Sequence, residues 1–479
     1  MLPFLKKYAI LKTEFQRSVP FMNKFSIANF KSGSSVHFIG IGGISMSALA
    51  EMMLYLGYKV SGSDRSNSDA LSKLREKGAE ICVGQKAENI KNPDLVCYTA
   101  AISEDNPELV RARELNVPVI ERAELLGELM TLYKFPLAVA GTHGKTTTTS
   151  MLSLILLAAE KDPTILVGGN LPQIEGNYRQ GKTDYLVLEA CEYVESFLHF
   201  HPFLSIITNI EADHLDYFVN LNNIISAFEK FARLNSPLGH IIVCFDDKNI
   251  QSIVQNFGKN VVKYGINTKN CEFVAENIKP NNKKGTDFDV LYMGKPFLSL
   301  SLNLSGKHVV YDALACVAAA VSLGIEKEAI KEGLESFTGT KRRFEKLGFF
   351  EGVEVVDDYA HHPTEIETTL KSAMEMGYND VWCIFQPHTY SRTKAFLNEF
   401  AEALSLADHV IIADIYPARE KYDGTIHSCD LAILIDKGVY INDFGAIERY
   451  IKKNAKKGDL VISMGAGSVT EIGHNLVKQ

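Results

Sequence analysis

The sequence predicts an α/β protein with three domains. Apolar strand segments alternate with amphipathic helical segments from residue 35 onward, and two of the strands run into glycine-rich turns that open a helix. The alternation restarts near residues 135 and 339, which indicates two further boundaries. The predicted parts are a disordered extension over residues 1–34 and domains over residues 35–134, 135–338 and 339–479.

Composition and charge exclude several classes of function. Lys plus Arg number 50 against 58 for Asp plus Glu, and the net charge of −8 gives no drive toward nucleic acid or an anionic membrane. No apolar run approaches the roughly 20 residues of a membrane helix, so no membrane insertion is expected. The eight cysteines include no close metal-binding or redox pair, and most stand in apolar contexts. We therefore expect a cytoplasmic enzyme.

The extension ahead of residue 35 is basic. It contains a single acidic residue, Glu14, and it lacks the long apolar region of a secretory signal. A transit-like peptide and a disordered or upstream-extended start both fit this pattern, and neither contributes to the fold. The basic residues are Lys6, Lys7, Lys12, Arg17, Lys24 and Lys31.

The first domain begins with a strand, a glycine turn and a helix. The turn contains Gly40, Gly42 and Gly43, and the next strand ends on Asp64. Glycines allow a diphosphate to approach the backbone closely, and an acid at that distance can bond ribose hydroxyls. A NAD-dependent dehydrogenase would share this pattern. The predicted elements are strands 35–40, 58–63 and 95–99 and helices 44–56 and 107–115.

The second domain carries the strongest motif. Strand 137–140 runs into the glycine-rich segment 141–149, which places Lys145 and Thr146 at the start of the helix 151–159. Backbone N–H groups and the helix dipole would face phosphates, Lys145 would add a point charge, and Thr146 would offer a hydroxyl to Mg²⁺. The common P-loop spacing needs glycine at position 139, which is valine, so the loop is a shortened form. A separate triphosphate cradle argues against hydride transfer.

Acidic and imidazole side chains follow two strands of this domain. Glu189 and Glu192 follow strand 185–188, whereas Asn209 and His214 follow strand 205–208. Strand ends are where α/β domains place their sites, and oxygen ligands suit Mg²⁺. The sequence therefore predicts a metal site beside the phosphate loop. The remaining predicted elements are a strand over 240–245, a hairpin loop over 277–285, and helices over 309–323 and 327–336.

The third domain has polar strings at strand ends. Arg392 could pair with a small carboxylate through its guanidinium fork. His361 and His362 precede a helix, so a helix cap and a solvated histidine are an equally good interpretation of that pair. The predicted elements are strands 353–356, 381–385, 410–414 and 459–463 and helices 364–376 and 393–406.

These motifs together resemble the Mur ligase family over nearly the whole chain from residue 35. The strings that carry the resemblance are HFIGIGGISMSALA, SGSD, GTHGKTTTT, LEACE, TNIEADHLDYF, GTKRRFE, DDYAHHPTE and QPHTYSRT. The resemblance implies a Rossmann-like N-terminal domain that binds a UDP sugar and a central P-loop ATPase-like domain that binds a mononucleotide. It also implies a Rossmann-like C-terminal domain that binds an amino acid.

Within the family the chain is most similar to members that join L-alanine to UDP-N-acetylmuramate in peptidoglycan biosynthesis. The implied reaction uses ATP and Mg²⁺ and passes through an acyl phosphate, which the alanine amine attacks. A tripeptide-recycling ligase of the same fold is the nearest alternative. A nucleotide-binding homologue that has lost catalysis is another.

The resemblance also implies roles for individual residues. The implied catalytic residues are Lys145, Glu189, His214 and Arg392, with Thr146, Glu189 and His214 on the metal. The implied ATP-binding residues are Gly141, Thr142, His143, Gly144, Lys145, Thr146, Thr147, Asp312 and Arg343. The implied residues for the sugar and the amino acid are Gly40, Gly42, Gly43, Asp64, His143, Asn209, Tyr359, His362 and Arg392.

The sequence departs from the family pattern at three places. Phe228 stands where members that add later residues carry a lysine, which favours the alanine-adding members. Cys191 stands where many members carry an acid. Val309 and Asp312 replace two asparagines that read adenine in relatives, so weaker ATP binding is expected. A structural role for Val309 and Asp312 at the start of a helix is an equal alternative.

Overall fold

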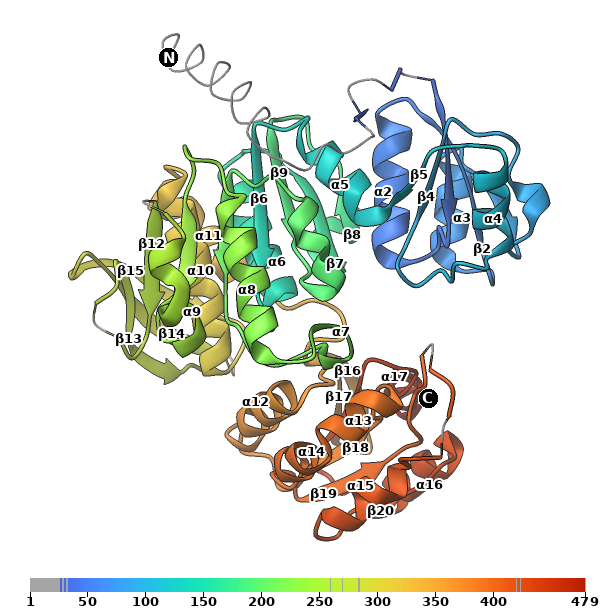
Figure 1. Cartoon of the computed structure of the whole chain (residues 1–479). Helices are drawn as coiled ribbons and strands as arrows, with labels where there is room; N and C mark the ends of the chain where they lie inside the picture. Colours follow the sequence, from blue (N-terminus) through green and yellow to red (C-terminus); the bar gives the residue numbers. More distant parts are fainter. Residues whose placement is uncertain are drawn as a thin grey trace. The chain divides into compact units, whose positions relative to one another are not determined.

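The computed structural model describes residues 26–478, apart from residues 28, 29, 32, 259, 269, 283, 284, 419 and 423 and the side chain of residue 216. The chain forms two compact units (Figure 1). The first holds the chain up to Gly42 and Ala50–Leu129, and the second holds Gly43–Leu49 and the chain from Met130 onward. Among the described helices, none combines the length and apolarity needed to cross a membrane.

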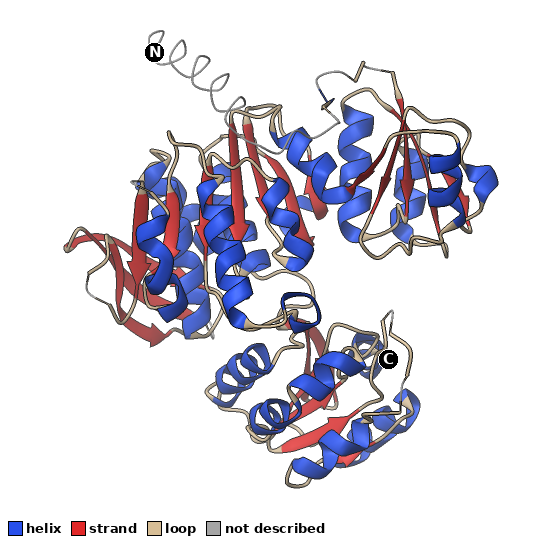
Figure 2. Ribbon diagram, viewed as in Figure 1, coloured by secondary structure: helices blue, strands red, loops and turns tan. Residues whose placement is uncertain are grey.

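The first unit is built on a five-stranded parallel sheet with the order β3-β2-β1-β4-β5. Its central strand is apolar and buried, because helices cover both faces of the sheet (Figure 2). The elements are β1 (Ser35–Ile39), α2 (Ile44–Tyr55), β2 (Lys59–Asp64), α3 (Asp69–Glu76), β3 (Glu80–Val83), η2 (Ala87–Asn89), β4 (Leu95–Tyr98), α4 (Pro107–Glu114), β5 (Val119–Glu121) and α5 (Arg122–Met130).

The second unit contains a ten-stranded sheet with the order β15-β14-β13-β12-β11-β10-β6-β9-β7-β8. Strand β6 lies in its interior between parallel partners β10 and β9, so its carboxyl end opens between two other strand ends. The elements are β6 (Phe135–Ala140), α6 (Lys145–Ala158), β7 (Thr164–Leu171), η3 (Pro172–Ile174), β8 (Gly176–Arg179), β9 (Tyr185–Glu189), η4 (Tyr193–His199), β10 (Leu204–Ile207), α7 (Leu215–Phe218), α8 (Leu221–Arg233), β11 (Ile241–Cys244), α9 (Lys248–Ile253), η5 (Val254–Asn256), β12 (Val261–Gly265), β13 (Phe273–Pro280), β14 (Thr286–Tyr292), β15 (Lys295–Leu302), α10 (Lys307–Ser322) and α11 (Lys327–Ser336).

The same unit contains a six-stranded sheet with the order β16-β17-β21-β18-β19-β20. Alternate residues of β18 enter two different cores: Cys383 packs with one helix layer and Trp382 with the other. This two-sided burial explains the continuous apolar run of β18. The elements are β16 (Glu345–Phe350), β17 (Val353–Asp358), α12 (Pro363–Met374), β18 (Val381–Phe385), α13 (Tyr390–Ala395), α14 (Leu397–Leu404), β19 (His409–Ile412), α15 (Ser428–Leu434), β20 (Val439–Tyr440), α16 (Phe444–Asn454), β21 (Leu460–Met464) and α17 (Thr470–Val477).

Two predicted elements differ from the structure. The predicted helix over 393–406 is two helices, α13 and α14, separated at Phe396, whose backbone angles are φ −119° and ψ 27°. The apolar residues at and after the break, Phe396, Leu397, Phe400 and Leu404, all pack on one core, so periodicity could not reveal the break. The predicted hairpin loop over 277–285 is shorter in the structure. Strand β13 continues to Pro280, with a bulge after Glu276, and its antiparallel partner β14 begins at Thr286, so the hairpin turns within the predicted range.

The fold begins earlier than the predicted residue 35. Ile27 is buried and its N–H donates to Glu128 Oε2 at 3.0 Å, and the Phe30 ring lies 6.2 Å from that of Tyr58. These residues therefore belong to the first unit, although the basic composition around them suggested otherwise. Residues 1–25 of the predicted extension lie outside the described residues.

Candidate active site

The glycine-rich loop after β6 has a backbone that only glycine accommodates. Gly141 adopts φ +143°, and a Cβ there would lie 1.9 Å from Thr208 Oγ1. Gly144 adopts φ +80° and caps α6 without a side-chain hydrogen bond, so the first N–H groups of this helix have no side-chain acceptor at the cap. The loop and the helix start therefore form a cradle suited to phosphate oxygens.

Lys145 lies in this cradle. Its ammonium donates to the carbonyl oxygens of Gly141 and Thr142 and forms an ion pair with Glu192 Oε2 at 3.0 Å. Burial alone would lower the pKa of Lys145, but the negative charge of Glu192 and its other acidic neighbours raises it. The lysine therefore keeps its positive charge although it is buried.

Thr146 and Glu189 lie together, as predicted for metal ligands. Thr146 bonds to Glu189, whose Oε1 also accepts from Gly168 N. A Cβ on Gly168 would lie 2.5 Å from Glu189 Oε2, so this glycine leaves room for the carboxylate. Burial raises the pKa of Glu189, because a buried carboxylate loses the stabilisation that water gives to its negative charge. A hydroxyl and a carboxylate oxygen are a suitable donor set for Mg²⁺.

His214, the third predicted metal ligand, lies beside other acids. Its Nε2 is 3.9 Å from Glu192 Oε1 and 3.7 Å from Asp213 Oδ2. Burial lowers its pKa, so the ring is available as a neutral donor. Lys145 interacts with the acidic residues near both predicted ligands. It forms an ion pair with Glu192, which lies near His214, and the negative charge of Glu189 also raises its pKa.

A different cluster brings together His143, Glu211 and His362, with one ligand atom from each within 4.8 Å of the others. Both ring nitrogens of His362 are already used, because Nδ1 accepts from Thr364 N and Nε2 lies 3.1 Å from the Ala212 carbonyl oxygen. We therefore assign these side chains to hydrogen bonding rather than to a metal.

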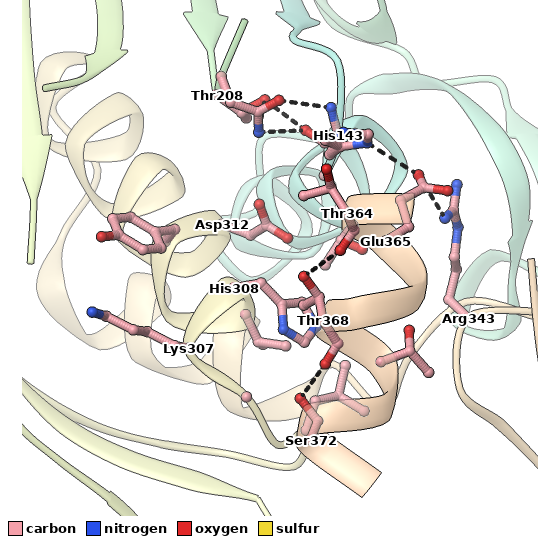
Figure 3. Close-up of a pocket in the computed structure, with 18 of the residues that line it drawn as sticks. His143, Thr208, Lys307, His308, Asp312, Arg343, Thr364, Glu365, Thr368 and Ser372 are labelled. Carbon is pink, nitrogen blue, oxygen red and sulfur yellow. Dashed lines mark hydrogen bonds and ion pairs between the residues drawn. The ribbon is translucent and has the colours of Figure 1, made fainter. Parts of the chain in front are cut away.

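A cavity of about 600 Å³ opens at the cradle (Figure 3). The loop and Thr208 line one side, while the start of α10 and the helix α12 line the others. Six of the nine predicted nucleotide residues line this cavity, namely His143, Gly144, Thr146, Thr147, Asp312 and Arg343, whereas Gly141, Thr142 and Lys145 are not among its lining residues. The described geometry thus brings residues from distant segments to one hollow of a size typical of small-molecule sites.

Asp312 lies on the second turn of α10, beneath the loop. Its Oδ1 accepts from Thr148 Oγ1 at 3.1 Å, and a Cβ on Gly144 would lie 2.5 Å from the same oxygen. Burial raises the pKa of Asp312 to about 8, so the carboxyl is largely protonated at neutral pH and can donate a hydrogen bond. This differs from the acceptor-only group expected from an ionised aspartate.

Replacing Asp312 with asparagine tests the raised pKa of the Asp312 carboxyl. The folded chain holds the Asp312 proton up to about pH 8, whereas the unfolded chain releases it near its ordinary pKa of 3.8. Stability therefore falls as pH rises between these values, and we expect Asp312→Asn to remove this fall because the amide does not titrate there. Thermal unfolding at pH 5 and pH 8.5 measures the difference. A fall of equal size in both proteins would contradict it.

The same variant, combined with Val309→Asn, tests adenine recognition. One bidentate contact is worth about 1–3 kcal/mol in base recognition, so the double variant is expected to raise the ATP:GTP ratio of kcat/KM by about 5- to 150-fold. If neither ATP affinity nor this ratio improves, Val309 and Asp312 have structural roles only.

Of the residues predicted for the amino acid, Arg392 and His362 both lie close enough to Asp213 to lower the pKa of its carboxyl. Arg392 pairs with Asp213 Oδ1 at 2.9 Å, and the Tyr359 ring faces the guanidinium groups of Arg342 and Arg343. His362 caps α12, as the alternative interpretation expected.

The predicted sugar-binding residues of the first unit form a glycine turn. Gly42 N donates to Asp64 Oδ2 at 2.8 Å, and a Cβ on Gly42 would lie 2.8 Å from that oxygen. Gly40 and Ile41 donate to the Ser63 carbonyl oxygen. The acid and the turn are thus adjacent, and Asp64 orders the turn itself.

Asn209 holds the phosphate loop, and sequence reasoning missed the charged residues around it. Its Oδ1 accepts from His143 N at 2.8 Å and its Nδ2 donates to His143 O at 3.1 Å. Glu211, Asp213 and Glu365 were not singled out as site residues. Glu365 stands three residues after the helix cap His362, a spacing typical of capping patterns, and that signal could have identified it.

Family models match three consecutive parts of the chain. The catalytic domain of the Mur ligase family matches residues 35–134, the Mur ligase middle domain matches 139–320, and the Mur ligase glutamate ligase domain matches 342–467. Together they span well over half of the sequence.

Individual relatives are similar over nearly the full length. The UDP-N-acetylmuramate–L-alanine ligase of Acetivibrio thermocellus is 51% identical over 95% of this chain and 98% of its own. That of Alkaliphilus metalliredigens is 49% identical over 93% and 97%. The solved UDP-N-acetylmuramate-alanine ligase of Thermotoga maritima gives a TM-score of 0.79 at 33% identity, over 92% of this chain and 98% of its own. A murein peptide ligase of Psychrobacter arcticus gives 0.71 at 26%, over 93% and 98%.

Proposed function

The chain belongs to the Mur ligase family, and on this premise we propose that it joins L-alanine to UDP-N-acetylmuramate with hydrolysis of ATP. The observation that carries the proposal is the 51% identity to an alanine ligase over 95% of the chain. The reaction is the first amino-acid addition of peptidoglycan synthesis. The tripeptide-recycling alternative is less favoured, since the murein peptide ligase is only 26% identical.

In this reaction the sugar carboxylate attacks the γ-phosphorus of ATP and ADP leaves. The alanine amine then attacks the acyl phosphate and releases inorganic phosphate. Lys145 and the N–H groups at the start of α6 would face the phosphates and offset the repulsion between two anions. Thr146, Glu189 and His214 would hold Mg²⁺. When bound, Mg²⁺ supplies positive charge to the phosphate oxygens.

Phosphate release tests the function. We expect release from ATP to require both UDP-N-acetylmuramate and L-alanine, with little release when the tripeptide replaces alanine. Preference for the tripeptide would identify a recycling ligase. ATP binding without any release would identify the impaired homologue.

We further propose a cytoplasmic location. All eight cysteines are free thiols, and four of them, Cys97, Cys244, Cys316 and Cys383, are buried. Free thiols are typical of a reducing compartment.

Arg392 is proposed to bind the alanine carboxylate. Its ion pair with Asp213 uses one terminal nitrogen, which leaves the rest of the guanidinium for a substrate. Arg392→Lys removes the fork but keeps the charge, so we expect the KM for alanine to rise about 10- to 100-fold with an unchanged KM for ATP. Arg449→Lys, at an exposed position on α16, is the matched control. A selective rise in the KM for ATP would move Arg392 to the nucleotide site.

A further inference from the structure

The imidazole of His143 lies between two carboxylates from different segments of the second unit. Its Nε2 is 3.3 Å from Glu211 Oε2. Its Nδ1 is 3.3 Å from Glu365 Oε1, and Figure 3 shows this second contact. A neutral imidazole carries one N–H, whereas an imidazolium carries two. Two carboxylate acceptors, one at each ring nitrogen, are therefore matched only by the charged form.

The backbone of His143 is fixed to the end of β10. Besides the two hydrogen bonds with Asn209, the His143 carbonyl oxygen accepts from Thr208 Oγ1 at 2.7 Å. The ring is therefore held relative to the phosphate loop, two residues before Lys145.

The two carboxylates are held from the side of α12. Glu211 Oε2 accepts from Thr364 Oγ1 at 2.9 Å. Glu365 accepts from His361 N at 3.1 Å and lies 3.7 Å from a guanidinium nitrogen of Arg343. His143 is thus the cation through which the phosphate loop and α12 contact each other.

The charges around the ring agree with this geometry. Burial alone would lower the pKa of His143, but the hydrogen bonds and charges of Glu211 and Glu365 raise it to about 9. The His362 ring, 5.0 Å away, stays neutral because burial lowers its pKa. Asp312 also faces His143, and its carboxyl is largely protonated at neutral pH. Glu211 and Glu365 are therefore the two anions that determine the charge of the ring.

We propose that Glu211 and Glu365 are positioning residues that keep His143 charged, so that it clasps the phosphate loop to α12 during the ligase reaction. The clasp rests on the proposed function, because it links the nucleotide cradle to the helix that His362 caps. As pH rises through about 9 the ring loses its second proton. The clasp then opens, and kcat/KM for ATP falls.

Histidine NMR of the substrate-free protein tests the clasp directly. Spectra of protein labelled at histidine are recorded against pH, and the signal absent from His143→Gln is assigned to His143. We expect it to titrate near pH 9. Glu365→Gln and Glu211→Gln should each lower this pKa by at least about one unit, because each removes an opposite charge at close distance. Glu367→Gln, an exposed position on the same helix, is the control and should not move it.

Two results would overturn the clasp. One is a wild-type His143 signal that titrates near the ordinary histidine pKa of 6.5. The other is a His143 pKa unchanged in both glutamine variants, which retain native dispersion of the other histidine signals. The alkaline limb of kcat/KM for ATP should move to lower pH in the same variants. Because the NMR measurement needs no substrate, its outcome is separate from failure of the ligase assay.

Discussion

Lys145→Ala is expected to lower kcat by at least about 10²- to 10³-fold while leaving the affinity for UDP-N-acetylmuramate unchanged. Lys145 and His143 are the two basic side chains of the loop, and the Lys145 ammonium keeps its charge in the cradle. Phosphate-release kinetics measure the first effect. Calorimetric titration with the UDP sugar measures the second, since the proposed sugar residues Gly42 and Asp64 lie in the first unit.

Stability needs a separate control, because Lys145→Ala leaves the buried Glu192 without its cation. The double variant Lys145→Ala/Glu192→Gln removes that charge as well. We expect it to recover the Tm of the wild type but not its turnover. Lys248→Ala, at an exposed lysine, should change neither. Near-normal turnover of Lys145→Ala would contradict the phosphate-cradle assignment.

Glu189→Gln is expected to raise the Mg²⁺ concentration for half-maximal activity by about 10- to 100-fold. The amide oxygen can still accept from Gly168 N, so packing is preserved while the negative charge is lost. His214→Ala should act in the same direction. Activity measured against Mg²⁺ concentration, together with Tm, separates a metal-binding role of Glu189 and His214 from a structural role. An unchanged Mg²⁺ dependence with a lowered Tm would show that Glu189 and His214 are structural.

Buried strands and the phosphate loop could be predicted from the sequence because their signals are local. The strand over 381–385 and the helix over 327–336 were predicted at their observed bounds. The strand is one uninterrupted apolar run, and the helix buries residues at helical spacing. The break at Phe396 was missed because Phe396 and the apolar residues that follow it pack on one core. The burial of Ile27 was missed because the apolar residues of this basic segment follow neither helical nor strand periodicity.

Contacts between distant segments could not be predicted in this way. Arg392 and Asp213 are 179 residues apart, and His143 and Glu365 are 222 apart. Each residue has an ordinary local role, as a loop residue or a helix cap. The arrangement of β10, α12 and α13 in the fold makes them partners.

The position of β6 inside its sheet also constrains how the chain acquires its site during synthesis. Both neighbours of β6, the strands β9 and β10, are translated after it, and the loop is held by Thr208 and Asn209. A nascent chain that ends before Asn209 therefore lacks the contacts that close the loop. In contrast, the antiparallel pairs β13–β14 and β14–β15 each join strands that are consecutive in the chain. During translation the phosphate cradle therefore cannot close until Thr208 and Asn209 have been added to the chain. The strands β13, β14 and β15, in contrast, can pair as soon as they leave the ribosome.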